Sequence, residues 1–324
     1  MTKLERILMT QTPLAFVLRK SKHWYLPGFE GVPLYDVIKF FYKQIKTVGL
    51  TERASAVAYN FIMAIPPSFL FLFTLIPSLP FISTGSIKLQ LHNIIKDIVP
   101  SAAYNVNIIK FVDSFFKGDK IGLLSFGLLL ALFFASNAMM GLMRSFNKNY
   151  IGFEKRKGLH NRWIAIRLTA LIFGLVLGCL ILLITQSAVL SWLVGLKKGF
   201  WSDFIFYARW VFIIALVFYS IAFIYKYAPA VQKRWKLTSP GTILATFLSI
   251  LATLGFSAFV NNFGKYNALY GSIGTIIMLM ALIFINSLIL LIGFELNVSI
   301  KSLKLIAEQR DAEEKRNTAS KQIT

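Results

Sequence analysis

Residues 54–81 read ASAVAYNFIMAIPPSFLFLFTLIPSLPF, and this stretch decides the fold. Its 28 residues carry no charged side chain, whereas about 20 apolar residues are enough to cross the hydrocarbon core of a bilayer. The stretch therefore predicts a transmembrane helix. Pro66 and Pro67 interrupt it, and because neither has an N–H, the carbonyls of Ile62 and Met63 lose their helical donors.

The proline pair leaves two interpretations open. In lipid, freed carbonyls persist only where protein or a cavity satisfies them, and broken helices near the middle of the membrane form the binding sites of many transporters. Alternatively, the prolines only kink the helix and so shape the bundle. The first interpretation makes Pro66 and Pro67 candidate transport or gating residues.

Five further apolar stretches follow along the chain. The six expected spans are residues 54–81, 122–143, 163–193, 204–225, 241–260 and 270–296. Hydrophobic residues make up 56% of the chain and charged residues only 15%, whereas soluble domains are about 25% charged. We therefore expect an all-α, polytopic membrane protein with six transmembrane helices and amphipathic flanking helices. The third span is long enough to require tilt, or a break near Thr185 and Gln186.

Positive charge is distributed unevenly between the expected loops. Residues 1–53, 144–162, 226–240 and 297–324 together hold 25 Lys and Arg, and the three intervening loops hold 8. The positive-inside rule predicts that both termini are cytoplasmic and that the loop at 82–121 is external. Residues 1–22 are not expected to be a signal peptide, since their apolar stretch is short and no small-residue cleavage site follows.

The net charge of +21 bears on partners. In a soluble protein it would indicate nucleic acid, but in a membrane protein cations gather on cytoplasmic loops and contact anionic lipids. We therefore expect membrane lipids, anionic on the cytoplasmic face, as partners, and no nucleic acid. Gly174 and Gly178 form a GxxxG pair in the third span, which allows close helix contact either within the chain or between protomers of a homo-oligomer.

Three regions follow from this topology: a cytoplasmic N-terminal segment at 1–53, a six-helix transmembrane domain at 54–300 and a cytoplasmic charged tail at 301–324. In 34–48, apolar residues recur at helical spacing opposite three lysines, which predicts an amphipathic helix on the inner membrane surface or against the bundle. Two short helices are expected in the external loop. The tail after Ala307 is expected to be a frayed helix and then disordered.

Glu295 is the only acidic residue within an expected span. A polar side chain in lipid must find a partner or a cavity, so it is a functional candidate by default. Glu295 is interpreted either as a proton or cation site, or as a residue at headgroup level that pairs with a loop arginine.

Other polar residues lie at the depth of the expected helices. The asparagines are Asn60, Asn137, Asn286 and Asn297. Interhelical hydrogen bonding is the default expectation for them, and a polar lining is the alternative. Arg167 and Arg209, near span ends, are expected to extend toward the interface or to line a path for an anionic headgroup.

The connection before the last span, residues 261–271, is rich in Asn, Gly and Tyr. Asn and Gly tolerate turns, and Tyr favours the membrane interface, so a tight external turn is the minimal interpretation. Its hydrogen-bonding side chains also make Tyr266, Asn267, Tyr270 and Gly271 candidates for external recognition or gating.

The sequence offers little for catalysis. Metal-dependent hydrolysis needs clustered His and carboxylates, but His23, His92 and His160 are scattered, and Cys179 is the single cysteine. A nucleotide-binding P-loop and a GxSxG nucleophile are also absent from the sequence. We therefore expect no enzyme activity, no metal and no cofactor.

Several motifs together resemble a known family. They are residues 54–59 followed by Pro66, 147–150, 225–229 followed by Trp235, Gly241, 266–274 and 291–297. In these the chain resembles the YihY/BrkB membrane proteins, a bacterial family once mislabelled ribonuclease BN, over roughly residues 35–300. The resemblance implies a six-span protein of the inner membrane. It adds weight to Tyr266, Asn267, Tyr270, Gly271 and Glu295 as site residues.

Two functions remain as expectations. The first is transport or translocation of a lipid or a small amphipathic or anionic solute without ATP, because Glu295, the proline pair and the external turn suit a path through the bundle. The alternative is a non-transporting membrane scaffold of the cell envelope, which the basic inner face would suit equally well. Ribonuclease activity is not expected.

Overall fold

The computed structural model describes residues 24–75, 121–147, 158–194, 201–231, 234–262 and 272–323, together with residues 92, 109, 110, 113, 150, 153 and 154. The helices of this part are α3 (Leu34–Thr47), α4 (Leu50–Leu75), α7 (Ile121–Phe146), α8 (Gly158–Val194), α9 (Trp201–Tyr227), α10 (Pro240–Asn262) and α12 (Ser272–Ile323). The predicted all-helical class is confirmed.

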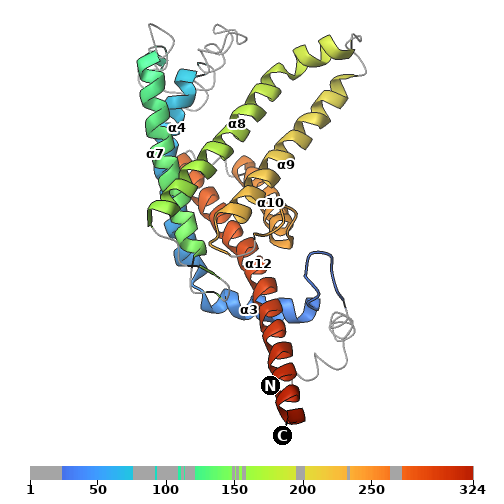
Figure 1. Ribbon diagram of the computed structural model, residues 1–324. Helices are drawn as coiled ribbons and strands as arrows, with labels where there is room; N and C mark the ends of the chain where they lie inside the picture. The colour runs from blue at the N-terminus through green and yellow to red at the C-terminus, as the bar shows by residue number, and fades with distance from the viewer. Residues whose placement is uncertain are drawn as a thin grey trace.

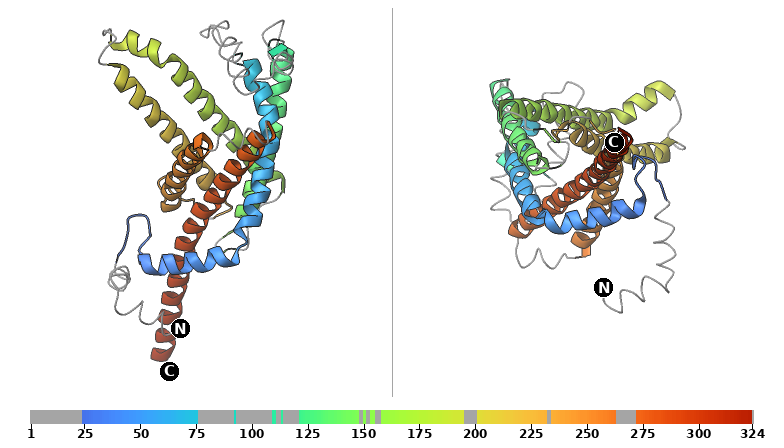
Figure 2. Two further views of the ribbon diagram at one scale, coloured as in Figure 1. Left: turned by 180° about the vertical axis from the view of Figure 1, so that it is seen from behind. Right: turned by 60° about the horizontal axis from the view of Figure 1, so that its bottom comes forward.

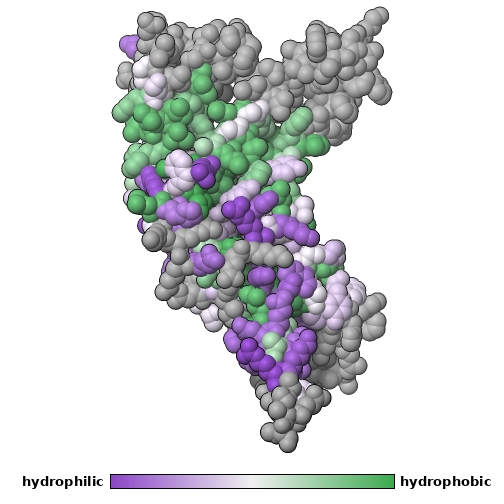
Figure 3. Space-filling model, viewed as in Figure 1, coloured by the Kyte–Doolittle hydropathy of each residue, from purple (hydrophilic) through white to green (hydrophobic). Residues whose placement is uncertain are grey.

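Six of the described helices, α4, α7, α8, α9, α10 and α12, hold stretches long and apolar enough to cross a membrane. Large apolar side chains lie exposed on their outer faces, among them Leu129 at 67% and Phe247 at 63%. Figure 3 shows this apolar surface as a band above the polar lower part of the molecule. A band of this extent is the surface expected for contact with lipid, so the six-span prediction is confirmed.

α4 runs through Pro66 and Pro67 as one α-helix. Of the two interpretations, the broken helix is therefore wrong, and the prolines lie within a continuous helix. Next to the two carbonyls that the prolines leave without a helical donor, the Ser68 hydroxyl donates a hydrogen bond of 2.7 Å to the carbonyl of Ala64, one turn before it. Side-chain hydroxyls of this kind satisfy backbone groups near prolines in membrane helices.

Two helices are longer than a bilayer needs. α8 has 37 residues and continues through Thr185 and Gln186, so no break occurs there, and Figures 1 and 2 show it leaning away from α7. α12 has 52 residues, about 78 Å at 1.5 Å per residue, against a hydrocarbon core of about 30 Å. It therefore extends well beyond the apolar layer.

The predicted disorder of the tail is wrong, because α12 continues as helix to Ile323. The exposed part of this helix has few apolar residues, and its side chains make contacts one turn apart along its surface. Lys304 Nζ lies 3.9 Å from Glu308 Oε1 one turn later, and Thr318 donates to the carbonyl of Glu314 at 2.7 Å. An ion pair at this spacing stabilises an exposed helix by about 0.2–0.5 kcal/mol, whereas a threonine bond to the carbonyl one turn earlier adds no such support.

α3 lies across α12 at the lower end of the bundle (Figure 1). Val37 is fully buried and joins Phe29, Val32 and Ile300 in a small apolar cluster. Ile38 and Tyr42, in contrast, are 54% and 60% exposed. The alternative in which this helix packs against the bundle is therefore confirmed, while part of its apolar surface remains uncovered by the described chain.

α10 and α12 cross in direct backbone contact. A Cβ atom on Gly241 would lie 2.0 Å from the carbonyl oxygen of Gly293, and a Cβ on Gly293 would lie 2.6 Å from that of Gly241. Glycine is thus required at both positions. Just below, the Asn297 carboxamide accepts a hydrogen bond from Gly241 N at 2.8 Å and donates one to Ser239 Oγ at 2.9 Å, which fixes the start of α10.

The bundle has one end at which α4, α8 and α10 begin and α7 and α9 end. We call it the basal end; it is the lower end in Figure 1, next to α3. The largest fully buried side chains, including Phe146, Tyr225, Phe294 and Glu295, belong to helices that meet there. The core of the molecule therefore lies toward the basal end.

Candidate functional site

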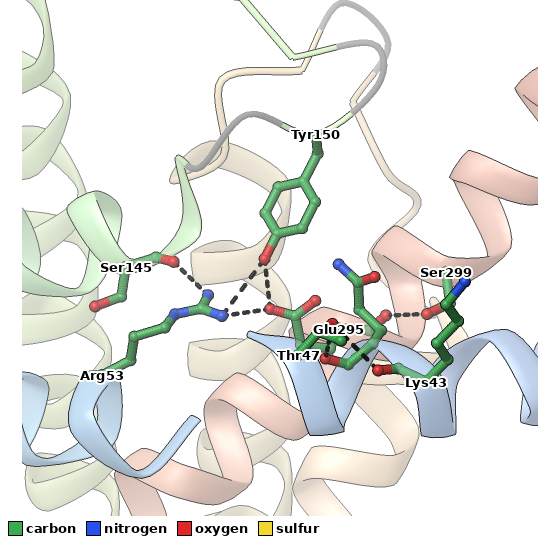
Figure 4. A network of polar contacts seen from close by, with 8 residues as sticks. Lys43, Thr47, Arg53, Ser145, Tyr150, Glu295 and Ser299 are labelled. Atoms are coloured by element: carbon green, nitrogen blue, oxygen red, sulfur yellow. Dashed lines mark hydrogen bonds and ion pairs between the residues drawn. The ribbon is translucent and has the colours of Figure 1, made fainter. Parts of the chain in front are cut away.

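A buried ion pair joins the first and last spans at the basal end. Arg53, in the first turn of α4, is 7% exposed, and Glu295 of α12 is 0% exposed. Arg53 Nη1 donates to Glu295 Oε1 at 2.6 Å. The phenol of Tyr150, in the connection between α7 and α8, donates to the same oxygen at 2.6 Å. Figure 4 shows the two donors converging on the carboxylate from separate elements.

Arg53 also binds the end of α7. Its Nη2 donates to the carbonyl of Ser145, one of the last carbonyls of that helix. Such carbonyls have no partner within the helix and carry partial negative charge, so a guanidinium both satisfies and stabilises them. Arg53 therefore connects α4, α7 and α12 at one point.

The Tyr150 side chain is held in its neutral form. Burial raises the pKa of the Tyr150 phenol well above its usual value, and the adjacent negative charge of Glu295 raises this pKa further. Arg53 acts in the opposite direction but is outweighed. The phenol is consequently protonated at neutral pH and can donate to the carboxylate.

The ion pair is not fully satisfied. Arg53 Nε and Glu295 Oε2 are buried and have no hydrogen-bond partner among the described residues. A buried polar atom without a partner costs about 1–3 kcal/mol, and more when it is charged. The pair therefore has capacity for a further proton, ion or hydrogen-bonding group at Oε2.

Aromatic rings cluster beside the pair, around Phe294. Phe294, the neighbour of Glu295, stacks on Phe146 with ring centroids 4.0 Å apart and an interplanar angle of 8°. Four further rings contact Phe294 with centroids 5.5–6.5 Å away: Tyr150, Phe153, Tyr225 and Trp235. We refer to Arg53, Tyr150, Glu295 and the rings around Phe294 as the basal seal.

Two connecting segments contact each other at the basal seal. The backbone N of Glu154 donates to the carbonyl of Ala230 at 2.7 Å, and Phe153 pairs with Val231 in an antiparallel β-bridge. In return, Ala230 N donates to the side chain of Asn147 at 2.9 Å. The α7–α8 and α9–α10 connections are thus joined to each other, and Tyr150 and Phe153 of the first contact Phe294.

The structure decides between the alternatives for Glu295 in part. It pairs with an arginine, as one interpretation expected, but the partner lies in the first turn of α4 and the pair is buried rather than at headgroup level. Sequence reasoning counted Arg53 only as a cytoplasmic cation and named Tyr150 only within a motif. The sequence did hold one signal for Arg53. It lies directly before the apolar run and one helical turn before Val57, so it belongs to the start of the first span rather than to a loop.

The asparagine expectation is confirmed for two of the four residues. Asn137 of α7 accepts a hydrogen bond from Arg162 of α8, and Asn297 binds the start of α10. The bonds that the structure shows for Asn60 and Asn286 return instead to carbonyls of their own helices. Asn60 packs on α7, since a Cβ on Gly141 would lie 2.7 Å from its amide nitrogen.

Several other predicted site residues cannot be compared with the basal seal. Tyr266, Asn267, Tyr270 and Gly271, like most of the loop at 82–121, lie outside the described residues, as does the side chain of Arg209. A Cβ on Gly174 or Gly178 would meet nothing within 4 Å, so this glycine pair forms no close contact within the described chain.

Metal-ligating groups are sparse in the described residues, where no three of His, Cys, Asp and Glu come together. One polar pair in the 82–121 loop is described: His92 Nε2 lies 2.7 Å from Asp113 Oδ1. It joins two segments of that loop and lies apart from the basal seal in sequence.

Comparison with known proteins identifies a family match and several relatives. The model of the family described as Virulence factor BrkB matches residues 41–319. The putative ribonuclease-like protein YfkH of Bacillus subtilis is 28% identical over 80% of this chain and 92% of its own length. UPF0761 membrane proteins of Tolumonas auensis and Haemophilus influenzae are 24% and 26% identical, over 92% and 83% of this chain and 96% of their own lengths.

No solved structure matches the chain. The family match covers far more than half of the sequence and includes both partners of the buried ion pair. With its six apolar spans and its resemblance to UPF0761 membrane proteins, the chain belongs to the BrkB (YihY/BrkB) family of integral membrane proteins.

Proposed function

We propose that this protein moves a lipid, or another amphipathic or anionic solute, across the bilayer without ATP. One observation carries the proposal: a cavity of about 380 Å³ between α4, α7 and α8. We call it the membrane cavity. Its volume lies within the roughly 300–1,000 Å³ that is usual for ligand sites.

The membrane cavity is suited to hydrocarbon. Most of its lining is aliphatic or aromatic, and the two hydroxyl-bearing residues are Ser68 and Thr169. Thr169 Oγ1 is buried and has no hydrogen-bond partner in the described part of the chain. A fully polar solute would find few partners here, whereas an acyl chain would match the walls and a single polar group could meet Thr169.

The basal seal supports a gate at one end of such a path. It joins the start of α4, the ends of α7 and α9 and the middle of α12, and its ion pair is buried. Movement of a solute past it requires the rings around Phe294 to separate and Arg53 to part from Glu295. A packed interface of this kind has discrete closed and open arrangements rather than a continuous range.

Glu295 offers a means of coupling solute movement to the binding of a proton. Protonation of its carboxylate would neutralise the partner of Arg53 and weaken the closed state, and Oε2 is the oxygen without a donor among the described residues. On this proposal the basal end faces the cytoplasm, because the Lys- and Arg-rich connections lie on that side by sequence.

The scaffold alternative has one specific observation in its favour. α3 lies flat across the basal end with Ile38 and Tyr42 exposed and with Lys39, Lys43 and Lys46 on the same helix. Such a helix suits attachment to an anionic lipid surface, which requires no transport.

The test is lipid movement in proteoliposomes that contain fluorescent anionic and zwitterionic phospholipids. Ala135→Phe places a ring in the membrane cavity, and Leu129→Phe places the same ring on the exposed surface of α7 as a matched control. We expect protein-dependent movement that Ala135→Phe abolishes and Leu129→Phe preserves. Absence of lipid movement with folded wild-type protein would reject the lipid form of the proposal.

A further inference from the structure

A second hollow, of about 280 Å³, lies at the basal ends of α8 and α9. Its polar lining comes from His160 and Arg167 of α8, Tyr227 at the end of α9, and Arg234 in the α9–α10 connection. Because α9 ends at Tyr227 and α8 begins nearby, the hollow lies where the apolar spans give way to the basal connections. We call it the headgroup hollow.

The positive charge of the headgroup hollow is not neutralised by the described chain. Its lining contains two guanidinium groups and no carboxylate. The contacts that the structure shows for them are aromatic: Arg167 lies 4.9 Å from the ring centroid of Trp163, and Arg234 lies 5.2 Å from that of Tyr227. Cation–π contacts orient a guanidinium but leave its N–H donors available for an anion.

One wall of the same hollow is apolar. Ile164, Leu168 and Leu171 line it at helical spacing along α8. This stripe continues in the direction of the span, so it provides a surface for a hydrocarbon chain whose polar end lies among the arginines. An inorganic anion would gain nothing from such a wall, whereas an amphipathic anion would contact both parts.

The geometry points to a binding site for the phosphate headgroup of an anionic phospholipid, with Arg167 and Arg234 as the phosphate ligands and the α8 stripe against an acyl chain. The planar guanidinium matches phosphate oxygens in a two-point geometry. This inference rests on the proposed function for its role, since it names the headgroup class of the solute. The binding itself can be measured without transport.

A neighbouring hollow provides the control. It has a volume of about 440 Å³ and shares Arg234, but its other cations are Lys236, Lys301 and Lys304, and Glu30 pairs with Lys304 at 3.1 Å. Lys301 lines this neighbouring hollow but does not line the headgroup hollow. Lys301→Gln therefore removes one basal charge without changing the headgroup hollow.

The experiment is native mass spectrometry of the full chain in detergent, titrated with phosphatidylglycerol and with phosphatidylcholine of equal chain length. We expect tighter binding of phosphatidylglycerol. Each arginine close to an anionic lipid contributes about 1 kcal/mol, so Arg167→Gln with Arg234→Gln should weaken that binding roughly 30-fold. Binding of phosphatidylcholine, whose phosphate charge is balanced by its own ammonium group, should weaken much less. Lys301→Gln should leave the affinity for phosphatidylglycerol within about twofold of that of the wild type.

Two results would overturn the inference. One is equal affinity of wild type and the double arginine variant for phosphatidylglycerol. The other is displacement of the bound lipid by glycerol phosphate at the concentration at which phosphatidylglycerol itself displaces it, which would identify a site for free phosphate rather than lipid. Arginine-dependent lipid binding without lipid movement in proteoliposomes would instead contradict only the proposed transport.

Discussion

Arg53 and Glu295 are 242 positions apart in the sequence, and their side chains meet at 2.6 Å inside the basal end of the bundle. The contact ties the first span to the last and draws the end of α7 into the same network through Ser145. Because the pair is buried, the effect of a substitution on the free energy of unfolding depends strongly on whether it removes both charges or only one.

The first prediction concerns this cost. Glu295→Gln leaves the Arg53 guanidinium buried without its counter-charge, and we expect a loss of about 3–5 kcal/mol in the free energy of unfolding. Replacing both residues by leucine should cost less than either single replacement by leucine, since no buried charge remains. Thermal unfolding in a mild detergent measures the order of the variants.

Glu313→Gln is the matched control for that series, because it makes the same chemical change on an exposed part of α12. It should leave the unfolding midpoint unchanged. Equal midpoints for Glu295→Gln and Glu313→Gln would show that the buried pair contributes nothing to stability.

The second prediction concerns the phenol of Tyr150. Tyr150→Phe keeps the ring against Phe294 but removes the hydrogen bond to the Glu295 carboxylate. A hydrogen bond to a charged group contributes about 1.5–3 kcal/mol, and we expect a loss of that size. Tyr42→Phe, at a residue that is 60% exposed, is the comparison and should cost far less. If the two substitutions cost the same, the contact with Glu295 is not stabilising.

The third prediction tests the crossing of α10 and α12. In Gly293→Ala the new methyl group would lie 2.6 Å from both the Gly241 carbonyl and the Tyr225 hydroxyl, so the helices must separate. We expect a loss of about 1–3 kcal/mol from overpacking. Gly174→Ala meets no atom within 4 Å and should be neutral or stabilising by up to about 1 kcal/mol, because alanine is the better helix former.

Opposite signs for these two alanine variants, measured by thermal unfolding, are the expected result. A stable Gly293→Ala protein with wild-type midpoint would mean that α10 and α12 do not approach as closely as the structure describes.

The fourth prediction concerns orientation. In a Cys179→Ala background, a cysteine introduced by Glu313→Cys should react with a membrane-impermeant maleimide only after the cells are permeabilised, because we propose that the basal end is cytoplasmic. A cysteine introduced by Lys88→Cys, in the loop expected outside, should react in intact cells. The reverse pattern of labelling would place the basal end outside and contradict the proposed topology.

Much of the fold was predictable because the membrane imposes a single strong requirement. Six apolar runs of sufficient length, separated by polar connections, identify six spans without knowledge of their contacts. The continuation of α4 through Pro66 and Pro67 was not predictable in this way. Whether a proline ends or only interrupts a membrane helix depends on the neighbouring helices and on other groups that a local sequence pattern does not identify.

The candidate site was only half predictable. Glu295 stands out as an acid within an apolar run, but its partners do not. By sequence, Arg53 is one of nine cations in residues 1–53, and Tyr150 lies in the basic connection after the second span. Only the packing of α4, α7 and α12 selects them among the alternatives. The extended α12 was missed for a related reason: composition alone indicated a polar tail, whereas continuity with a fixed span favours further helix.

The proposed gate can be locked directly. Phe153 and Val231 face each other in an antiparallel bridge, where Cα atoms lie about 4.5–5.5 Å apart, and disulfides join Cα atoms about 4.4–6.8 Å apart. Phe153→Cys with Val231→Cys, in a Cys179→Ala background, should therefore form a disulfide that holds the basal seal closed.

Lipid movement by this double variant in proteoliposomes is the measurement that tests the central claim most directly. We predict that oxidation stops the movement, that reduction restores it, and that each single cysteine variant is insensitive to both treatments. Equal rates of lipid movement in the oxidised and reduced double variant, with the disulfide verified, would contradict a gate at the basal seal.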